Sequence, residues 1–248
     1  MSGHSKWSTI KRKKGANDAR RGKIFTKLIK EISVAAKLGG PDPEANPRLR
    51  LAIQNAKGQN MPKDNIERAI KKATGADSAD YHEVTYEGYA PHGVAVFVEC
   101  TTDNLNRTVA SVRAIFSKYG GALGTNGSVE YLFERKGVFT LQLPEDRDED
   151  ELTLELIDAG AEDVEVEDGV MTITCAMEDF GKMQKKMEEL GLEPENAELM
   201  RIPTTTVSLS DEEFQKAMRC IEALEDDDDV QKVFHNIEAK DEQLQTLE

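Results

Sequence analysis

The order of apolar patterns between residues 136 and 201 constrains the fold of this 248-residue chain more than any other feature. Short apolar runs predict strands at 137–143, 164–167, 170–175 and 197–201. Helical spacing predicts two helices, each ended by a glycine, at 150–159 and 180–190. The Asp168-Gly169 pair favours a tight hairpin between the second and third strands. Strand, helix, strand, strand, helix, strand is the order of a ferredoxin-like domain.

The same order can be assembled from two stretches that flank this module. After a short strand at 84–89, residues 94–133 supply a strand, a helix capped by Asp103 or Asn104, and a strand at 128–133. Residues 204–236 supply strands at 205–209 and 230–234, around a helix that begins with the capping-box pair Ser210 and Glu213. A lone strand-helix-strand piece is too small to bury both its faces. We therefore expect the 136–201 module to be inserted into a second ferredoxin-like domain.

The chain before residue 80 has helical rather than strand periodicity. Its alanine-rich apolar faces are modest, so we expect these helices to depend on their neighbours for stability. The predicted fold class is α+β: an N-terminal all-helical domain followed by two ferredoxin-like α/β domains, the last one inserted into the middle one. The predicted segments are a basic arm at 1–22, a helical domain at 23–80, a discontinuous ferredoxin-like domain at 81–134 plus 203–238, an inserted ferredoxin-like domain at 135–202 and a frayed tail at 239–248.

Charge is distributed unevenly along the chain. The net charge is −15, yet residues 1–80 hold 18 basic against 8 acidic residues, a net of +10. The remaining residues hold 14 basic against 39 acidic residues, a net of −25. An acidic body repels phosphate, so any contact with nucleic acid has to be local and directed by the N-terminal part.

Cations gather in the arm and along one face of the helix that follows it. Four adjacent cations, Lys11 to Lys14, repel one another unless an anion lies nearby. For the helix lysines alone, a water-facing surface is the plain alternative. We predict that nucleic acid, either DNA or ribosomal RNA, is bound by Lys6, Trp7, Lys11, Arg12, Lys13, Lys14, Arg20, Arg21, Lys23, Lys27 and Lys30.

No arrangement of catalytic residues is visible in the sequence. The glycine-rich stretch 120–127 follows a helix and precedes a strand, the reverse of a phosphate-binding loop, and we interpret it as a flexible connection. The run Asp226 to Asp229 lacks the spacing of a calcium loop and is predicted to be a solvated turn. The histidines and cysteines lack zinc-site spacing. We predict that the protein is not an enzyme and has no metal, no cofactor and no small-molecule substrate.

Several other side chains allow both a functional and a structural interpretation. Tyrosines in strands can stack on bases, but packing between strand and helix is favoured for Tyr81, Tyr86, Tyr89 and Tyr119. His92 lies in a Pro-His-Gly turn, where contact with a phosphate and a plain turn role are equally open. Met183 and Met187 are predicted to fill the core rather than to bind a cofactor.

The sequence also predicts a cytoplasmic protein. The cysteines, Cys100, Cys175 and Cys220, are odd in number and lie in apolar patterns, which is typical of buried thiols in a reducing compartment. The N-terminus lacks the apolar segment of a signal peptide, and no apolar run approaches the length of a membrane span. A membrane partner is therefore not expected.

Five stretches resemble the YebC family: GHSKW at 3–7, KGANDARRGKIFTKLIKEI at 14–32, NPRLRLAI at 46–53, NMPKDNIERAI at 60–70 and YEGYAPHGVA at 86–95. Ser8-Thr9 and Lys11-Arg12-Lys13 depart from the family's usual segment after Trp7, although the charge is kept. The resemblance implies a three-domain cytoplasmic protein that regulates transcription by binding DNA. A mitochondrial relative is a translational activator and bacterial relatives are linked to stalled ribosomes, which implies a translation factor as the alternative.

The residues themselves leave these functions open. The cations are of the kind that hold a phosphate backbone, and no helix carries Arg, Asn and Gln placed to read a major groove. An arm that orders on a shaped RNA surface fits a ribosome-associated translation factor. A third possibility is a scaffold whose acidic domains bind a basic partner.

Overall fold

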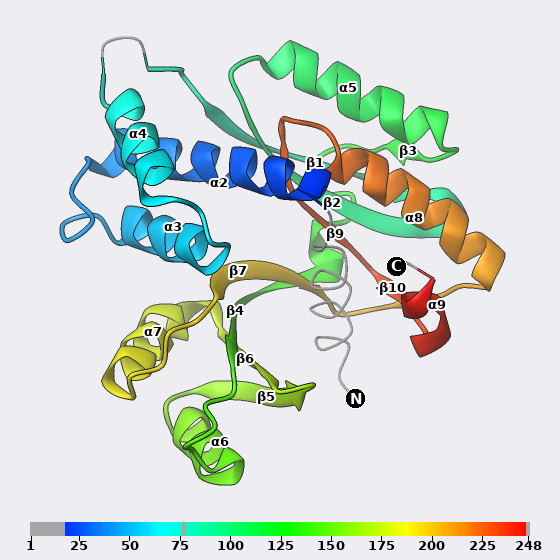
Figure 1. The fold of residues 1–248 in the computed structure, drawn as a ribbon. Coiled ribbons are helices and arrows are strands. Elements are labelled where there is room, and N and C mark those ends of the chain that lie inside the picture. The colour runs from blue at the N-terminus through cyan, green and yellow to red at the C-terminus, as the bar shows by residue number, and fades with distance from the viewer. Residues whose placement is uncertain (1–17, 76–77, 247–248) are drawn as a thin grey trace. The chain divides into compact units, whose positions relative to one another are not determined.

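A computed structural model describes residues 18–75 and 78–246, with side chains from Gly22 onward (Figure 1). The chain divides into two compact units. The first unit comprises Met1–Lys30, Ala76–Glu134 and Ile202–Glu248, and the second comprises Glu31–Gly75 and Arg135–Arg201. Each unit is built around one four-stranded sheet.

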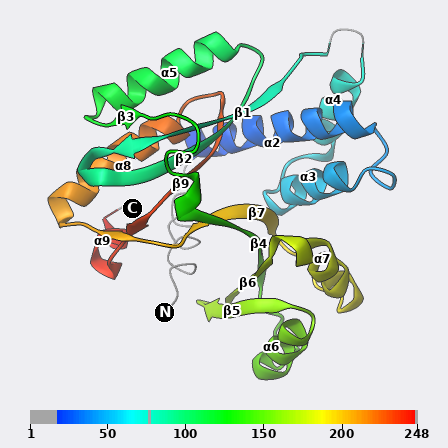
Figure 2. The ribbon, with the colours of Figure 1, turned by 180° about the vertical axis from the view of Figure 1, so that it is seen from behind.

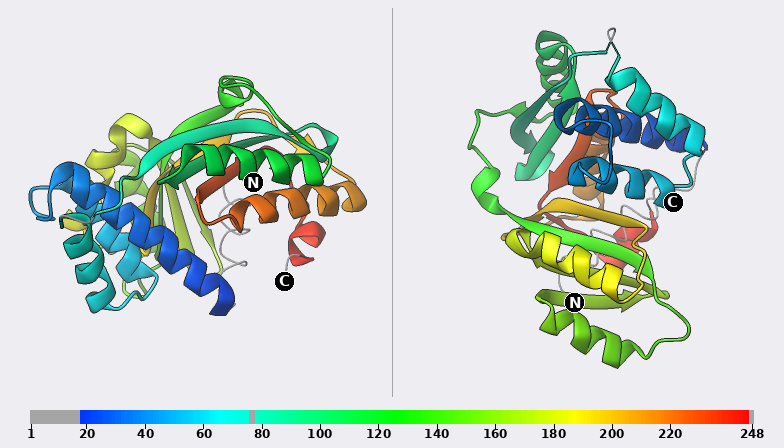
Figure 3. Two further views of the ribbon diagram at one scale, coloured as in Figure 1. Left: turned by 90° about the horizontal axis from the view of Figure 1, so that it is seen from above. Right: turned by 90° about the vertical axis from the view of Figure 1, so that its left-hand side faces the viewer.

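The sheet of the first unit has the strand order β3-β1-β2-β9. Its strands are β1 (His82–Ala90), β2 (Val94–Thr102), β3 (Ala122–Leu123) and β9 (Val230–His235). Helices α5 (Leu105–Lys118) and α8 (Asp211–Glu225) lie side by side against one face, where they bury a core that includes Val96, Phe116 and Ile221 (Figure 3). Asn104 caps α5, and Ser210 and Glu213 form the expected capping box of α8.

Two predicted strands of this domain are wrong in detail. Residues 128–133 do not form a strand, because Glu130–Leu132 is a 3-10 turn (η2), and the two-residue β3 pairs with β1 instead. Of 205–209 only β8 (Val207–Ser208) is extended, and it pairs in parallel with β10 (Ile237–Glu238) outside the main sheet. Instead of the two predicted strands, β1 lies beside β2, and all nine residues of β1 pair with residues of β2.

A buried carboxylate explains the first of these differences. Glu87, in β1, is 3% exposed, and its side chain accepts hydrogen bonds from the backbone N–H groups of Gly127, Val129 and Glu130 at 2.6–2.8 Å. Backbone donors that are satisfied by a carboxylate are not available to a neighbouring strand. The glycine-rich stretch 120–127, interpreted as flexible, is therefore fixed at its end by Glu87.

Replacing Glu87 with glutamine should destabilise the protein by about 1.5 kcal/mol, the cost of weakening hydrogen bonds to a charged group. The amide exchange of Gly127, Val129 and Glu130, measured by NMR, should accelerate together. The exposed Glu145 provides the control, since Glu145→Gln should leave those three amides unchanged. Unaltered protection in the Glu87 variant would show that the loop is held by other contacts.

The sheet of the second unit has the order β5-β6-β4-β7 (Figure 2). Its elements follow one another along the chain as predicted: strand, helix, strand, strand, helix, strand. Its strands are β4 (Phe133–Gln142), β5 (Ala161–Glu167), β6 (Val170–Ala176) and β7 (Asn196–Pro203). A short 3-10 turn, η3 (Met177–Asp179), precedes α7 (Phe180–Glu189), which packs on the sheet with α6 (Glu149–Asp158). The Asp168-Gly169 turn has φ values of 52° and 76°, as a tight hairpin requires.

Helices α3 (Pro47–Gly58) and α4 (Lys63–Ala73), with the second part of α2 (Asp18–Gly39), belong to the same unit as this sheet. The side chain of Asn55, in α3, pairs with the backbone of Ala197, in the edge strand β7. Asn55 Nδ2 donates to the carbonyl oxygen at 2.9 Å, and Oδ1 accepts from the N–H at 2.9 Å. This pair of bonds gives a structural basis for the expected dependence of the alanine-rich helices on a neighbour.

The C-terminal tail also differs from the prediction of a frayed segment. Residues Asp241–Gln245 form helix α9, which buries Gln243 and Leu244. Leu244 joins the core of the first unit, and Gln243 Nε2 donates to the carbonyl oxygen of Leu209 at 3.0 Å. The tail is mostly polar in composition, yet the buried Leu244 docks it onto the first unit.

Candidate nucleic-acid interface

The structure describes only part of the predicted interface. Lys6, Trp7, Lys11, Arg12, Lys13 and Lys14 lie outside the described residues. Arg20 and Arg21 belong to α2, but their side chains are outside the described part. Of the predicted interface, the structure therefore places the side chains of Lys23, Lys27 and Lys30.

These lysines share one face of α2, since residues four and three positions apart are neighbours on a helix. The structure brings that face against the turn that follows α8. Lys23 Nζ lies 2.7 Å from Asp226 Oδ1, and Lys27 Nζ donates to the carbonyl oxygen of Glu225 at 2.8 Å. The lysine face therefore meets an acidic segment of the same unit, a partner that the sequence analysis did not foresee.

Lys30 is held most firmly of the three. Its ammonium group donates to the carbonyl oxygens of Asp228 and Thr101 and lies 3.3 Å from Asp229 Oδ1. Its side chain is 12% exposed, and it also lies over the ring of Tyr81, 5.8 Å from the centroid. An ammonium group with this many acceptors is not available to phosphate.

Asp229 is the centre of this contact. Although it is 5% exposed, its carboxylate accepts from Arg107 Nη2 at 2.8 Å, Arg107 Nε at 3.1 Å and Thr108 Oγ1 at 2.9 Å. Burial alone would raise the pKa of Asp229, but the hydrogen bonds from Arg107, Thr108 and Lys30 outweigh it and hold the pKa below its usual value. The prediction of a solvated turn is therefore wrong for Asp229, because its charge is fully paired.

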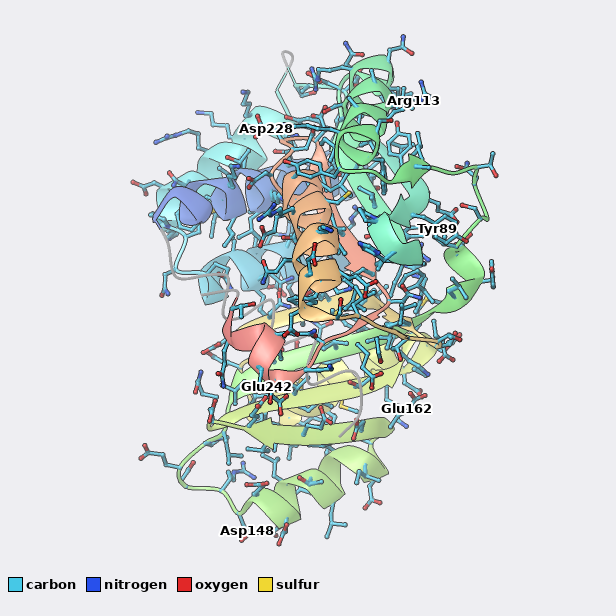
Figure 4. The ribbon with its side chains drawn as sticks, turned by 90° about the vertical axis from the view of Figure 1, so that its right-hand side faces the viewer. Tyr89, Arg113, Asp148, Glu162, Asp228 and Glu242 are labelled. Atoms are coloured by element: carbon cyan, nitrogen blue, oxygen red, sulfur yellow. The ribbon has the colours of Figure 1, made fainter. Side chains whose placement is uncertain are left out.

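The other aspartates of the turn are more accessible. Asp228, labelled in Figure 4, and Asp226 are exposed. Asp227 is half-buried and accepts a hydrogen bond from Ser111. A signal for the whole arrangement was present in the sequence. The acidic run lies at the C-terminal end of α8, which has no basic residue in its last turn. Negative charge there is unfavourable beside the helix dipole, so it requires cations from another segment.

The remaining candidates are mostly structural. Tyr86 and Tyr119 pack against the core of the first unit, and Met183 and Met187 are buried, as predicted. Tyr89 is 37% exposed and donates to the carbonyl oxygen of Ser128, while Tyr131, which the sequence analysis did not single out, is 72% exposed. His92 has a positive φ of 66°, and its Nδ1 lies 3.5 Å from Glu213.

The described residues also limit other chemistry. Burial raises the pKa of the Cys100 thiol to about 12 and those of Cys175 and Cys220 to about 11, so these thiols stay protonated at neutral pH. Among residues 18–75 and 78–246 no three His, Cys, Asp or Glu side chains are grouped to hold a metal ion. No helix in that part of the chain is long and apolar enough to cross a membrane.

Comparison with known proteins matches most of the chain to one family. Residues 5–76 match the TACO1/YebC protein N-terminal domain, and residues 81–237 match the TACO1/YebC second and third domain. A "Probable transcriptional regulatory protein" of Amoebophilus asiaticus is 60% identical over 239 residues, covering 96% of this chain and 98% of the relative. One of the same description from Geotalea uraniireducens is 52% identical over 248 residues, covering 100% of both chains.

A solved structure agrees with this assignment. The crystal structure of the conserved hypothetical protein Aq1575 from Aquifex aeolicus has a TM-score of 0.80 and 49% sequence identity, over 89% of this chain and 91% of that one. The likeness confirms the predicted fold class, with helices first and antiparallel sheets after them. The chain therefore belongs to the TACO1/YebC family.

Proposed function

We propose that this chain is a non-enzymatic, cytoplasmic regulator of gene expression that holds nucleic acid by its phosphate backbone through the basic arm. The observation that carries the proposal is the charge distribution, +10 in residues 1–80 against −25 in the rest. A cationic leading segment on an acidic body confines the contact to one end of the chain. Lys23, Lys27 and Lys30 already contact the acidic turn, so the proposal assigns the main contact to the cations of the arm.

DNA is the first proposed target, because the relatives are named probable transcriptional regulatory proteins. Ribosomal RNA is the second, and one observation favours it. The described part of α2 directs Lys23, Lys27 and Lys30 at the acidic turn, and after Arg20 and Arg21 its sequence from Gly22 to Gly39 contains no Arg, Asn or Gln. That stretch of the helix is poorly suited to read base edges in a major groove. A ribosome-associated translation factor needs only shape and backbone contacts.

Replacing Lys11, Arg12, Lys13 and Lys14 together with alanine should weaken binding at least about tenfold and reduce the salt slope of the association constant by about three. The measurement is fluorescence anisotropy of a labelled DNA duplex and a labelled single-stranded RNA at several salt concentrations. The circular dichroism spectrum should not change.

The matched control removes four exposed cations elsewhere, with alanine at Lys57, Arg68, Lys71 and Lys72. That variant loses the same charge and should retain most of the affinity and nearly all of the salt slope. Equal losses in the two variants would mean that net charge rather than the arm determines binding, and the proposal would then be wrong.

Two experiments separate the proposed targets. In a sucrose gradient of cell lysate, co-migration with ribosomes that survives DNase supports ribosomal RNA. A protected operator sequence in footprinting supports DNA. Binding to random DNA at low salt supports neither, because any basic arm binds it.

A further inference from the structure

We infer that the acidic turn at the end of α8, residues 225–229, competes with nucleic acid for Lys23 and Lys27 of α2. This mechanism regulates the proposed site and rests on the proposed function. The turn offers what a phosphate backbone offers, closely spaced anionic and carbonyl oxygens. Lys23 and Lys27 each meet one of these oxygens at 2.7–2.8 Å. Each ammonium group has three N–H donors but only one positive charge. An anion already paired with that charge weakens its attraction for a phosphate, so the turn and the phosphate compete for it.

The lysine contacts fall into two classes of different strength. Lys30 and Asp229 are 12% and 7% exposed and share their network with Arg107, so this pair anchors the helix. Lys23 and Asp226 are 44% and 66% exposed, and an exposed pair of this kind is weak and easily screened. Lys23, followed by Lys27, is therefore the contact that a polyanion can displace while Lys30 keeps α2 in place.

The position of Asp226 supports a role beyond the stability of its own helix. It is the C-cap residue of α8, where a negative charge opposes the helix dipole. Its carboxylate gains its ion pair from Lys23, more than 200 positions away along the chain. In this arrangement the turn pairs with Lys23, the first lysine after the arm, whenever nucleic acid is absent. A polyanion must displace the turn to contact Lys23, so the turn lowers the affinity for weakly binding polyanions.

The test compares Asp226→Asn with Glu145→Gln, an exposed acid that lies outside the first unit. Each change removes one negative charge from the full-length chain. Fluorescence anisotropy with a labelled single-stranded RNA and a labelled DNA duplex should show about threefold tighter binding for Asp226→Asn than for Glu145→Gln, the scale of one exposed ion pair. The gain should disappear in the double variant Asp226→Asn/Lys23→Gln, compared with Lys23→Gln alone.

Each result has a distinct meaning. Thermal unfolding of Asp226→Asn should match that of the native chain, which shows that the Lys30 anchor is intact. Equal affinities for Asp226→Asn and Glu145→Gln, or a gain that persists without Lys23, would overturn the inference while leaving the proposed function standing. Binding of the native chain that is indifferent to the arm substitutions would overturn the proposed function instead.

Discussion

Replacing Asp229 with alanine should destabilise the protein by about 4 kcal/mol, because it leaves the nearly buried ammonium group of Lys30 and the buried hydroxyl of Thr108 without their partner. Asp229 is 5% exposed and accepts from Arg107, Thr108 and Lys30. Its backbone is also part of the fold, since Thr101 N–H donates to its carbonyl oxygen at 2.8 Å. Alanine keeps the backbone bond and removes the carboxylate, so urea unfolding should report the loss of the charge network itself.

The exposed neighbour Asp226 is the matched control. Its pair with Lys23 has side chains 66% and 44% exposed, so Asp226→Ala should change the unfolding free energy by less than about 1 kcal/mol. Similar losses for Asp226→Ala and Asp229→Ala would show that the turn acts through its total charge. The network around Asp229 would then not be the anchor of α2.

The same network predicts a pH dependence with a definite sign. The pKa of Asp229 is lower in the folded chain than its usual value, so the folded state favours the ionised form. Its contribution to stability is complete above the unfolded-state pKa, about 4, and is lost as the pH falls through the lower folded-state pKa. The native chain should therefore lose stability below about pH 4 more steeply than Asp229→Asn, and parallel acid unfolding curves would contradict the assignment.

Replacing Gly58 with alanine should cost about 3 kcal/mol or more in the second unit, although alanine normally favours a helix. A Cβ at Gly58 would lie 1.9 Å from the carbonyl oxygen and 2.7 Å from the carbonyl carbon of Glu195. These are backbone atoms, so no rotamer change relieves the overlap. Either α3 or the segment before β7 must move, and the Asn55–Ala197 hydrogen bonds lie at that junction.

Gly181, in α7, is the control for this substitution. A Cβ there meets nothing within 4 Å, so Gly181→Ala should be neutral or stabilise the chain by up to about 1 kcal/mol. Neither glycine has a positive φ, so backbone conformation does not distinguish them. Urea unfolding should show a loss of stability for Gly58→Ala and none for Gly181→Ala. A neutral Gly58→Ala would mean that α3 can separate from Glu195 without cost.

Local signals in the sequence predicted the elements whose hydrogen bonds and apolar faces are local. Three features depend only on residues that are close in the chain: the Asp168-Gly169 hairpin, the capping box at Ser210 and the glycines that end helices. The apolar patterns of the inserted domain were sufficient to predict its order of strands and helices, because each strand pairs with a partner from the same short stretch. The predictions of strands at 128–133 and 205–209 were wrong because backbone groups there hydrogen-bond to side chains that are distant in the sequence. Val129 N–H donates to Glu87, and the carbonyl oxygen of Thr205 accepts from Asn236.

For the candidate site, the sequence alone determined where the cations are and that they are separated from an acidic body. It could not determine which cations are occupied. That depended on the tertiary structure, which places Lys23, Lys27 and Lys30 beside the turn at 225–229, some 200 positions later in the chain. The physical reason is that charge pairing depends on distance in space, while periodicity and composition report only neighbours along the chain.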